Sequence, residues 1–72
     1  MMVIKVKNEV MDVEEMNTDA YGRPRIKVTP RSGNIEYIRG ARNNRKAGNW
    51  IIQAWAGTKQ TLTNKFGNYE EL

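Results

Sequence analysis

The chain has no cysteine and no histidine among its 72 residues, and it has only one phenylalanine. Disulfide bonds are therefore excluded, and a zinc site is not expected without these ligands. A chain of this length makes one small domain that buries only about 60% of its unfolded surface. We therefore expect residues 1–72 to form a single domain, and a homodimer would be one way to stabilise so thin a core.

The sequence also has no long apolar run and no recognisable catalytic pattern. Without a membrane-spanning segment or an export signal, we expect no membrane association and a cytoplasmic location. The adjacent acid pairs Glu14–Glu15 and Glu70–Glu71 would point to opposite faces of a strand, so neither pair can share a substrate. The glycines form no phosphate-binding loop. We expect neither an enzyme nor a cofactor.

The basic residues are concentrated in the middle of the chain. Residues 1–20 carry two lysines against five acidic residues, a net charge of −3, whereas residues 21–66 carry ten basic residues against one glutamate, a net charge of +9. Such a block is the electrostatic pattern expected of a nucleic-acid-binding surface. A solvated basic face on a soluble domain would give the same pattern.

Alternation of apolar and polar residues predicts a mostly β fold. Residues 2–6 and 25–29 alternate with a period of two, which is typical of half-buried strands. Residues 10–16 fit either a strand or a helix face, and we favour the strand. Residues 17–24 and 30–34 have the composition of loops. The prediction is a small antiparallel sheet or barrel-like domain of about five strands, with little or no helix.

Residues 35–66 form the predicted three-stranded core of the domain, with residues 1–33 as extra strands or a cover. Extended runs are expected at residues 35–39, 49–56 and 59–63, with a basic loop between the first two. Both faces of residues 49–56 are largely apolar, so we expect a central strand covered on each side. Trp50 is the expected core residue. Trp55, on the opposite face, either contacts a ligand or is covered by residues 1–16.

A cluster of basic side chains near this loop is the strongest candidate for a binding site. Arginine can bridge two acceptors on guanine or grip a phosphate, and a two-stranded ribbon fits the major groove of DNA. A polar hairpin loop with no binding role would have a similar composition. Trp55 could stack on a sugar or base beside Gln53. The candidate cluster consists of Arg39, Arg42, Arg45 and Lys46.

Short motifs in residues 35–72 resemble the ethylene-response-factor type of DNA-binding domain. They are Arg39-Gly40-Ala41-Arg42, Gly48-Asn49-Trp50, and Phe66-Gly67-Asn68-Tyr69-Glu70-Glu71. Domains of this type also occur in phage and mobile-element proteins, and related domains bind arm sites in some integrases. The resemblance implies a three-stranded sheet whose exposed face enters the major groove of duplex DNA, with a helix behind it. By position, the contact residues would be Arg39, Arg42, Gln53, Trp55, Lys59 and Thr61.

The resemblance leaves the back face of the sheet without a cover, because its packing helix would begin only where the chain stops, at Leu72. We expect that the chain is a fragment, that residues 1–33 cover this face, or that a second copy does. The favoured function is a DNA-binding module of phage or mobile-element type. The alternative is a protein-binding module, such as a phage-encoded factor that docks on or inhibits a host or viral protein.

Overall fold

The computed structural model describes residues 1–34, 42–44 and 48–72, and in residues 42–44 it describes the backbone only. Over this part of the chain the protein is mostly β, with one six-stranded antiparallel sheet and one helix. The strand order is β4-β5-β3-β2-β1-β6. The predicted fold class is therefore confirmed. The elements are β1 (Met2–Val6), β2 (Glu9–Met16), β3 (Arg25–Pro30), β4 (Arg42–Asn44), β5 (Asn49–Gln53), α1 (Thr58–Phe66) and β6 (Glu70–Glu71).

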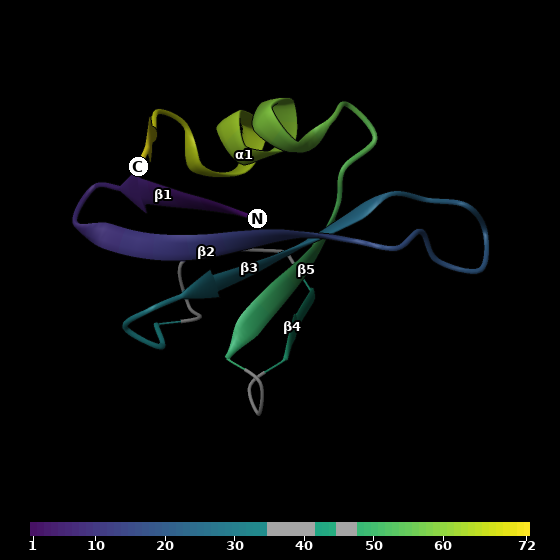
Figure 1. Cartoon of the computed structure of the whole chain (residues 1–72), viewed down its shortest axis with the longest axis horizontal. Helices are drawn as coiled ribbons and strands as arrows, with labels where there is room; N and C mark the ends of the chain where they lie inside the picture. The colour runs from purple at the N-terminus through teal and green to yellow at the C-terminus, as the bar shows by residue number, and fades with distance from the viewer. Residues whose placement is uncertain (35–41, 45–47) are drawn as a thin grey trace.

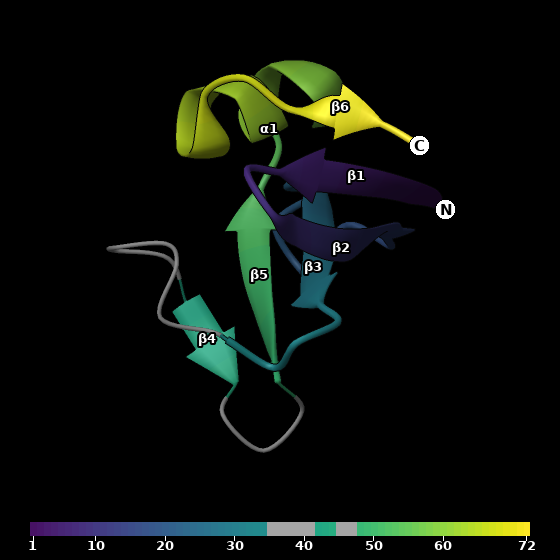
Figure 2. The ribbon, with the colours of Figure 1, turned by 90° about the vertical axis from the view of Figure 1, so that its left-hand side faces the viewer.

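The sheet is twisted, with the helix at one end of the molecule and the β4–β5 ribbon at the other (Figures 1 and 2). Strands β1, β2 and β3 follow one another as antiparallel neighbours. Residues 1–33 thus extend the sheet as extra strands, as one of the sequence-based alternatives proposed. Residues 10–16, whose pattern fitted either structure, lie in β2. In the part of the chain that the structure describes, no helix is long and apolar enough to cross a membrane.

One face of the sheet carries the core. Alternating residues of β1, β2, β3 and β5 turn inwards, and the antiparallel register aligns them: Met11 pairs with Ile4, Val13 with Val28, and Val28 with Trp50. The predicted buried face of β5 is confirmed, because Trp50 is 0% exposed and Ile52 only 4%. Burial of such side chains is the main favourable term in folding. The complete core is Ile4, Val6, Met11, Val13, Ile26, Val28, Trp50, Ile52, Ala54 and Leu62.

Helix α1 lies where the sequence pattern predicted a third strand, so the strand expected at residues 59–63 is wrong. Only Leu62 is apolar among residues 59–63, so this segment does not show whether its apolar residues repeat with the period of a strand or of a helix. Leu62 and Phe66 are four residues apart and therefore share one face of a helix. Leu62 is fully buried, and the ring of Phe66 meets Trp50 edge to face with centroids 6.2 Å apart. This tertiary contact stabilises a helix too short to persist alone.

The helix supplies the cover that the sequence left unidentified. It begins after Gly57, whose φ of 97° and ψ of 162° are accessible essentially to glycine alone. It packs on the inner face of the sheet, while the short β6 pairs with β1. The neighbours of β5 are β3 and β4 rather than a following strand. The expected strand at residues 35–39 lies outside the described residues.

Candidate nucleic-acid interface

The outer face of β5 is open at the end of the strand that leads to the helix. Gln53 is exposed, Trp55 is 66% exposed, and Ile51 is half-buried. The expectation that β5 is covered on both faces is therefore wrong for this end. The helix follows β5 and packs on the inner face, so the outer residues stay accessible. Of the two tryptophans, Trp50 belongs to the core and Trp55 to the surface.

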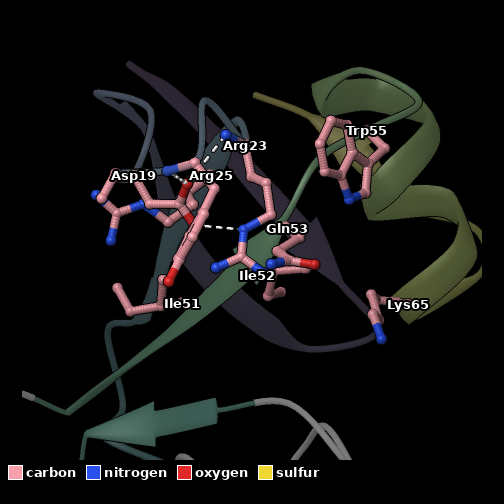
Figure 3. A pocket seen from close by; sticks show the side chains of 10 residues that line it. Asp19, Arg23, Arg25, Ile51, Ile52, Gln53, Trp55 and Lys65 are labelled. Atoms are coloured by element: carbon pink, nitrogen blue, oxygen red, sulfur yellow. Dashed lines mark hydrogen bonds and ion pairs between the residues drawn. The ribbon is translucent and has the colours of Figure 1, made fainter.

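A hollow of about 740 Å³ lies beside this open end of β5 (Figure 3). We call it the Trp55 hollow. It is bounded by the loop before β3, by the outer faces of β3 and β5, and by the last turn of α1. The polar and aromatic side chains that line it and matter to its chemistry are Tyr21, Arg23, Arg25, Gln53, Trp55 and Lys65.

The loop before β3 is ordered by one carboxylate, that of Asp19. Its Oδ1 accepts the backbone N–H groups of Tyr21 at 2.9 Å and Arg23 at 3.0 Å, and its Oδ2 accepts the Arg23 Nε–H at 2.6 Å. A backbone bond from the Ala54 N–H to the Pro24 carbonyl, 3.0 Å, joins the loop to the end of β5. Aspartate favours such turns because its side chain can accept bonds from the backbone that follows.

Asp19 stays ionised in this setting. Partial desolvation of its carboxyl group acts to raise the pKa, but the backbone N–H groups of Arg23 and Tyr21 and the Arg23 guanidinium outweigh it. The pKa is therefore lowered from its ordinary value of 3.8. The Arg23 guanidinium also lies 4.9 Å from the centroid of the Tyr21 ring, a cation–π geometry. The loop thus holds both Arg23 and Tyr21 at the rim of the hollow.

Arg25 is the cation on the sheet side of the hollow. It pairs in register with Gln53 of β5, which places both residues on the outer face. Its Nη2 donates to the Asn17 carbonyl at 3.1 Å, but its shielded Nε–H finds no acceptor among the described residues. A guanidinium with an unused donor is only partly compensated for the water it has lost. Lys65, from the last turn of α1, is also among the residues that line the hollow (Figure 3).

Most other described cations near the sheet are engaged by acids. Lys27 lies 3.0 Å from Glu14, and Arg31 lies 2.9 Å from Asp12 across the β2–β3 ladder. Lys59 lies 3.6 Å from Glu71. By contrast, no ion pair to Arg25 or Lys65 is formed within the ranges that the structure covers. The unpaired charge of this part of the surface therefore gathers at the Trp55 hollow.

The structure brings together only part of the predicted contact set. Gln53 and Trp55 meet at the hollow, as their shared strand face suggested. Lys59 and Thr61 do not lie on a third strand: both are in α1, where Thr61 is 5% exposed and packed inwards. Arg42 is in β4, in register with Ile51. The predictions for Arg39, Arg45 and Lys46 fall outside the described residues.

Sequence reasoning missed four contributors to the hollow, namely Tyr21, Arg23, Arg25 and Lys65. For Arg25 a signal was present, since it alternates with the buried Ile26 and must face outwards. Tyr21 and Arg23 sit in a loop whose fold depends on Asp19. A strand at residues 59–63 would give no reason to place Lys65 beside Gln53. Its position depends on the helix.

Fold and site together define a small, mostly β domain: one antiparallel sheet, a single packed helix, and a cationic, aromatic hollow on the outer face. Comparison of the chain with protein-family profiles, with curated proteins and with solved structures gives no match. The function must therefore be argued from the site itself.

Proposed function

We propose that this chain is a small DNA-binding module of phage or mobile-element type that contacts duplex DNA with the outer face of β3 and β5. The observation that carries the proposal is the unequal use of the two faces of β5. The inner face holds Trp50 and Ile52 in the core, while the outer face presents Gln53 beside Arg25. A sheet face with exposed amide and guanidinium groups can reach base edges and phosphates.

The β4–β5 ribbon supports the same proposal. It stands at the end of the molecule away from the helix, where a two-stranded ribbon can enter a major groove (Figure 2). Arg42 of β4 is in register with Ile51 on β5. In the sequence, Arg39 precedes β4, and Arg45 and Lys46 follow it. The sequence around β4 is therefore rich in arginine and lysine, the residue types that a DNA-binding ribbon needs.

The proposal predicts strongly salt-dependent binding. Affinity for a short labelled duplex, followed by fluorescence anisotropy, should fall steeply between about 50 and 200 mM salt, because each neutralised phosphate releases counterions. Arg25→Ala should weaken binding and lower the slope of the log–log salt plot by about one. The double variant Arg39→Ala, Arg42→Ala should weaken it further.

Arg31→Ala is the matched control for Arg25→Ala. Arg31 directly follows β3, the strand on which Arg25 lies, and loses the same charge on substitution, but it is engaged by Asp12. Its removal should leave the slope nearly unchanged. If the unaltered protein binds no duplex even at low ionic strength, the proposal is wrong.

A second candidate function is a protein-binding module. The observation that favours it is the exposure of two large aromatic side chains, Tyr21 at 82% and Trp55 at 66%. Exposed aromatics of this kind are common anchors of protein interfaces. A partner that co-purifies with the chain and is lost with Trp55→Ala, together with no DNA binding, would favour this candidate. A homodimer would instead show as a doubled mass in size-exclusion chromatography with light scattering.

A further inference from the structure

The Trp55 hollow combines features that a paired base in a duplex cannot use. Its aromatic part is Trp55, 66% exposed at the end of β5. An indole face binds a base by stacking, and in a duplex both faces of each base are already covered by neighbouring bases. An exposed tryptophan beside unpaired cations therefore fits a base that has left the stack, or one that was never paired.

The charge of the hollow suits a phosphate. Three cations line it, Arg23, Arg25 and Lys65, against the single carboxylate of Asp19. The Asp19 carboxylate already forms an ion pair with the Arg23 guanidinium, with Oδ2 and Nε 2.6 Å apart. This leaves Arg25 on the sheet side and Lys65 on the helix side without an acidic partner in the part of the chain that the structure describes. Arginine and lysine together are a common phosphate-binding pair.

The size of the hollow fits one nucleotide. Its volume of about 740 Å³ falls within the range of sites that hold small organic ligands, roughly 300–1,000 Å³. Gln53 lies between Arg23 and Trp55 in the lining of the hollow (Figure 3). A glutamine amide can both donate to and accept from the edge of a base. An aromatic face, an amide and two cations that have no acidic partner among the described residues therefore line a space of suitable volume.

We propose that the Trp55 hollow binds one unpaired nucleotide of DNA, with the base stacked on Trp55 and a phosphate held by Arg25 and Lys65. The inference rests on the proposed function, because the sheet face and the β4–β5 ribbon supply the contact with the duplex. The proposed ligand is therefore duplex DNA with an unpaired nucleotide, rather than any duplex DNA. The protein prefers a duplex that continues into a single strand over a fully paired duplex of the same length.

The test compares three DNAs in the same buffer: a blunt duplex, the same duplex with a short thymidine overhang, and a single strand of thymidines. Anisotropy of the labelled DNA gives the affinity, and protein fluorescence reports stacking. Trp50 is 0% exposed, so quenching on addition of DNA comes from Trp55. We expect the overhang duplex to bind about 5- to 160-fold more tightly than the blunt duplex, the range given by one base–aromatic stack. Quenching should occur with the overhang and the single strand only.

The variants separate stacking from charge. Trp55→Ala should abolish the quenching and bring the overhang affinity down to that of the blunt duplex, whereas Trp55→Phe should keep part of the preference. Lys65→Ala should weaken binding of the overhang. Lys59→Ala is its matched control, because Lys59 lies on the same helix but is 73% exposed and paired with Glu71 outside the hollow. Circular dichroism of each variant verifies that it is folded.

The outcomes distinguish this inference from the proposed function. Equal affinities for blunt and overhang duplexes would overturn the inference and leave duplex binding standing. Equal losses from Lys65→Ala and Lys59→Ala would also overturn it, since the charge of the helix rather than the hollow would then be responsible. Binding of the single strand alone would support the hollow and overturn duplex binding. Failure of all three DNAs to bind at low salt would overturn both.

Discussion

Two regions of the outer surface of the sheet differ in whether their cations form ion pairs with acidic residues. In one, the paired surface of β2 and β3, Glu14 engages Lys27 and Asp12 engages Arg31. In the other, the Trp55 hollow, Arg25 and Lys65 have no acidic partner among the described residues. Arg25 and Lys27 are only two residues apart on β3 and share its outer face. Their difference comes from the cross-strand neighbour, which is Met16 for Arg25 and Glu14 for Lys27.

This difference shows that charge separated along the sequence is not separated in space. The acidic N-terminal segment and the start of the basic block lie on antiparallel neighbours, so the register of β2 and β3 brings opposite charges together. Two ion pairs result, Asp12 with Arg31 and Glu14 with Lys27, and a third, Asp19 with Arg23, forms within the loop before β3. Exposed pairs of this kind add little stability. They leave Arg25 and Lys65, at the Trp55 hollow, without an acidic partner among the described residues.

The largest expected effect on stability comes from replacing the buried Trp50. The same change at Trp55 tests whether the hollow lies outside the core. Trp50→Ala should lower the free energy of unfolding by about 3–5 kcal/mol, because it empties a fully buried site in contact with Phe66. Trp55→Ala should change it by no more than about 0.5 kcal/mol, since its ring is largely in water. Urea unfolding followed by circular dichroism measures both. Similar losses for the two variants would show that the hollow is part of the core.

The next largest effect on stability is expected at the turn between β5 and α1. Gly57→Ala should cost about 1–3 kcal/mol, because alanine cannot adopt its backbone angles without strain. An added Cβ would meet no neighbouring atom, so the cost is conformational rather than a clash. Ala56→Ser, one residue earlier and exposed, is the control and should be nearly neutral. A neutral Gly57→Ala, measured by the same unfolding titration, would mean that the turn does not fix the helix.

Much of the fold could be predicted from alternation alone. Strands β1, β2, β3 and β5 each turn one set of apolar residues inwards, and a period of two makes that face readable from the sequence. The core role of Trp50 follows from the same parity. The helix could not be found this way, because of its two inward residues only Leu62 lies in the window 59–63, and Phe66 lies beyond it. The four-residue spacing of Leu62 and Phe66 becomes visible only in a window that extends to Phe66.

The site was less predictable than the fold, because it is assembled from distant segments. Gln53 and Trp55 are two residues apart, so the sequence suggests that they point to the same side, although β5 ends at Gln53 and Trp55 lies in the turn that follows. Lys65 joins them only because α1 folds back beside the end of β5. Arg23 is fixed by Asp19 in a loop whose composition indicates a turn but not its shape. Segment charge sums could not show which cations have acidic partners, since this depends on the β2–β3 register.

The smallest expected effect is the acid sensitivity of the paired surface. The hydrogen bonds from Arg31, aided by its charge and opposed by partial desolvation, lower the pKa of Asp12 below its ordinary value of 3.8. The unfolded chain therefore takes up this proton at a higher pH than the folded protein does. The pair contributes stability that is present above about pH 3.8 and is lost as the pH falls through the folded pKa. Arg25 and Lys65 have no acidic partner among the described residues, so these two cations add no such loss.

Unfolding midpoints in urea, measured from neutral pH down to about pH 2.5, test this difference. Asp12→Asn and Arg31→Ala remove the same pair from opposite sides, and each should make the loss of stability in acid shallower than in the unaltered protein. The double variant should add nothing further, since the pair is already gone. Arg25→Ala is the control from the hollow and should leave the acid profile unchanged in shape. If Arg31→Ala keeps the full loss in acid, the lowered pKa of Asp12 does not come from Arg31.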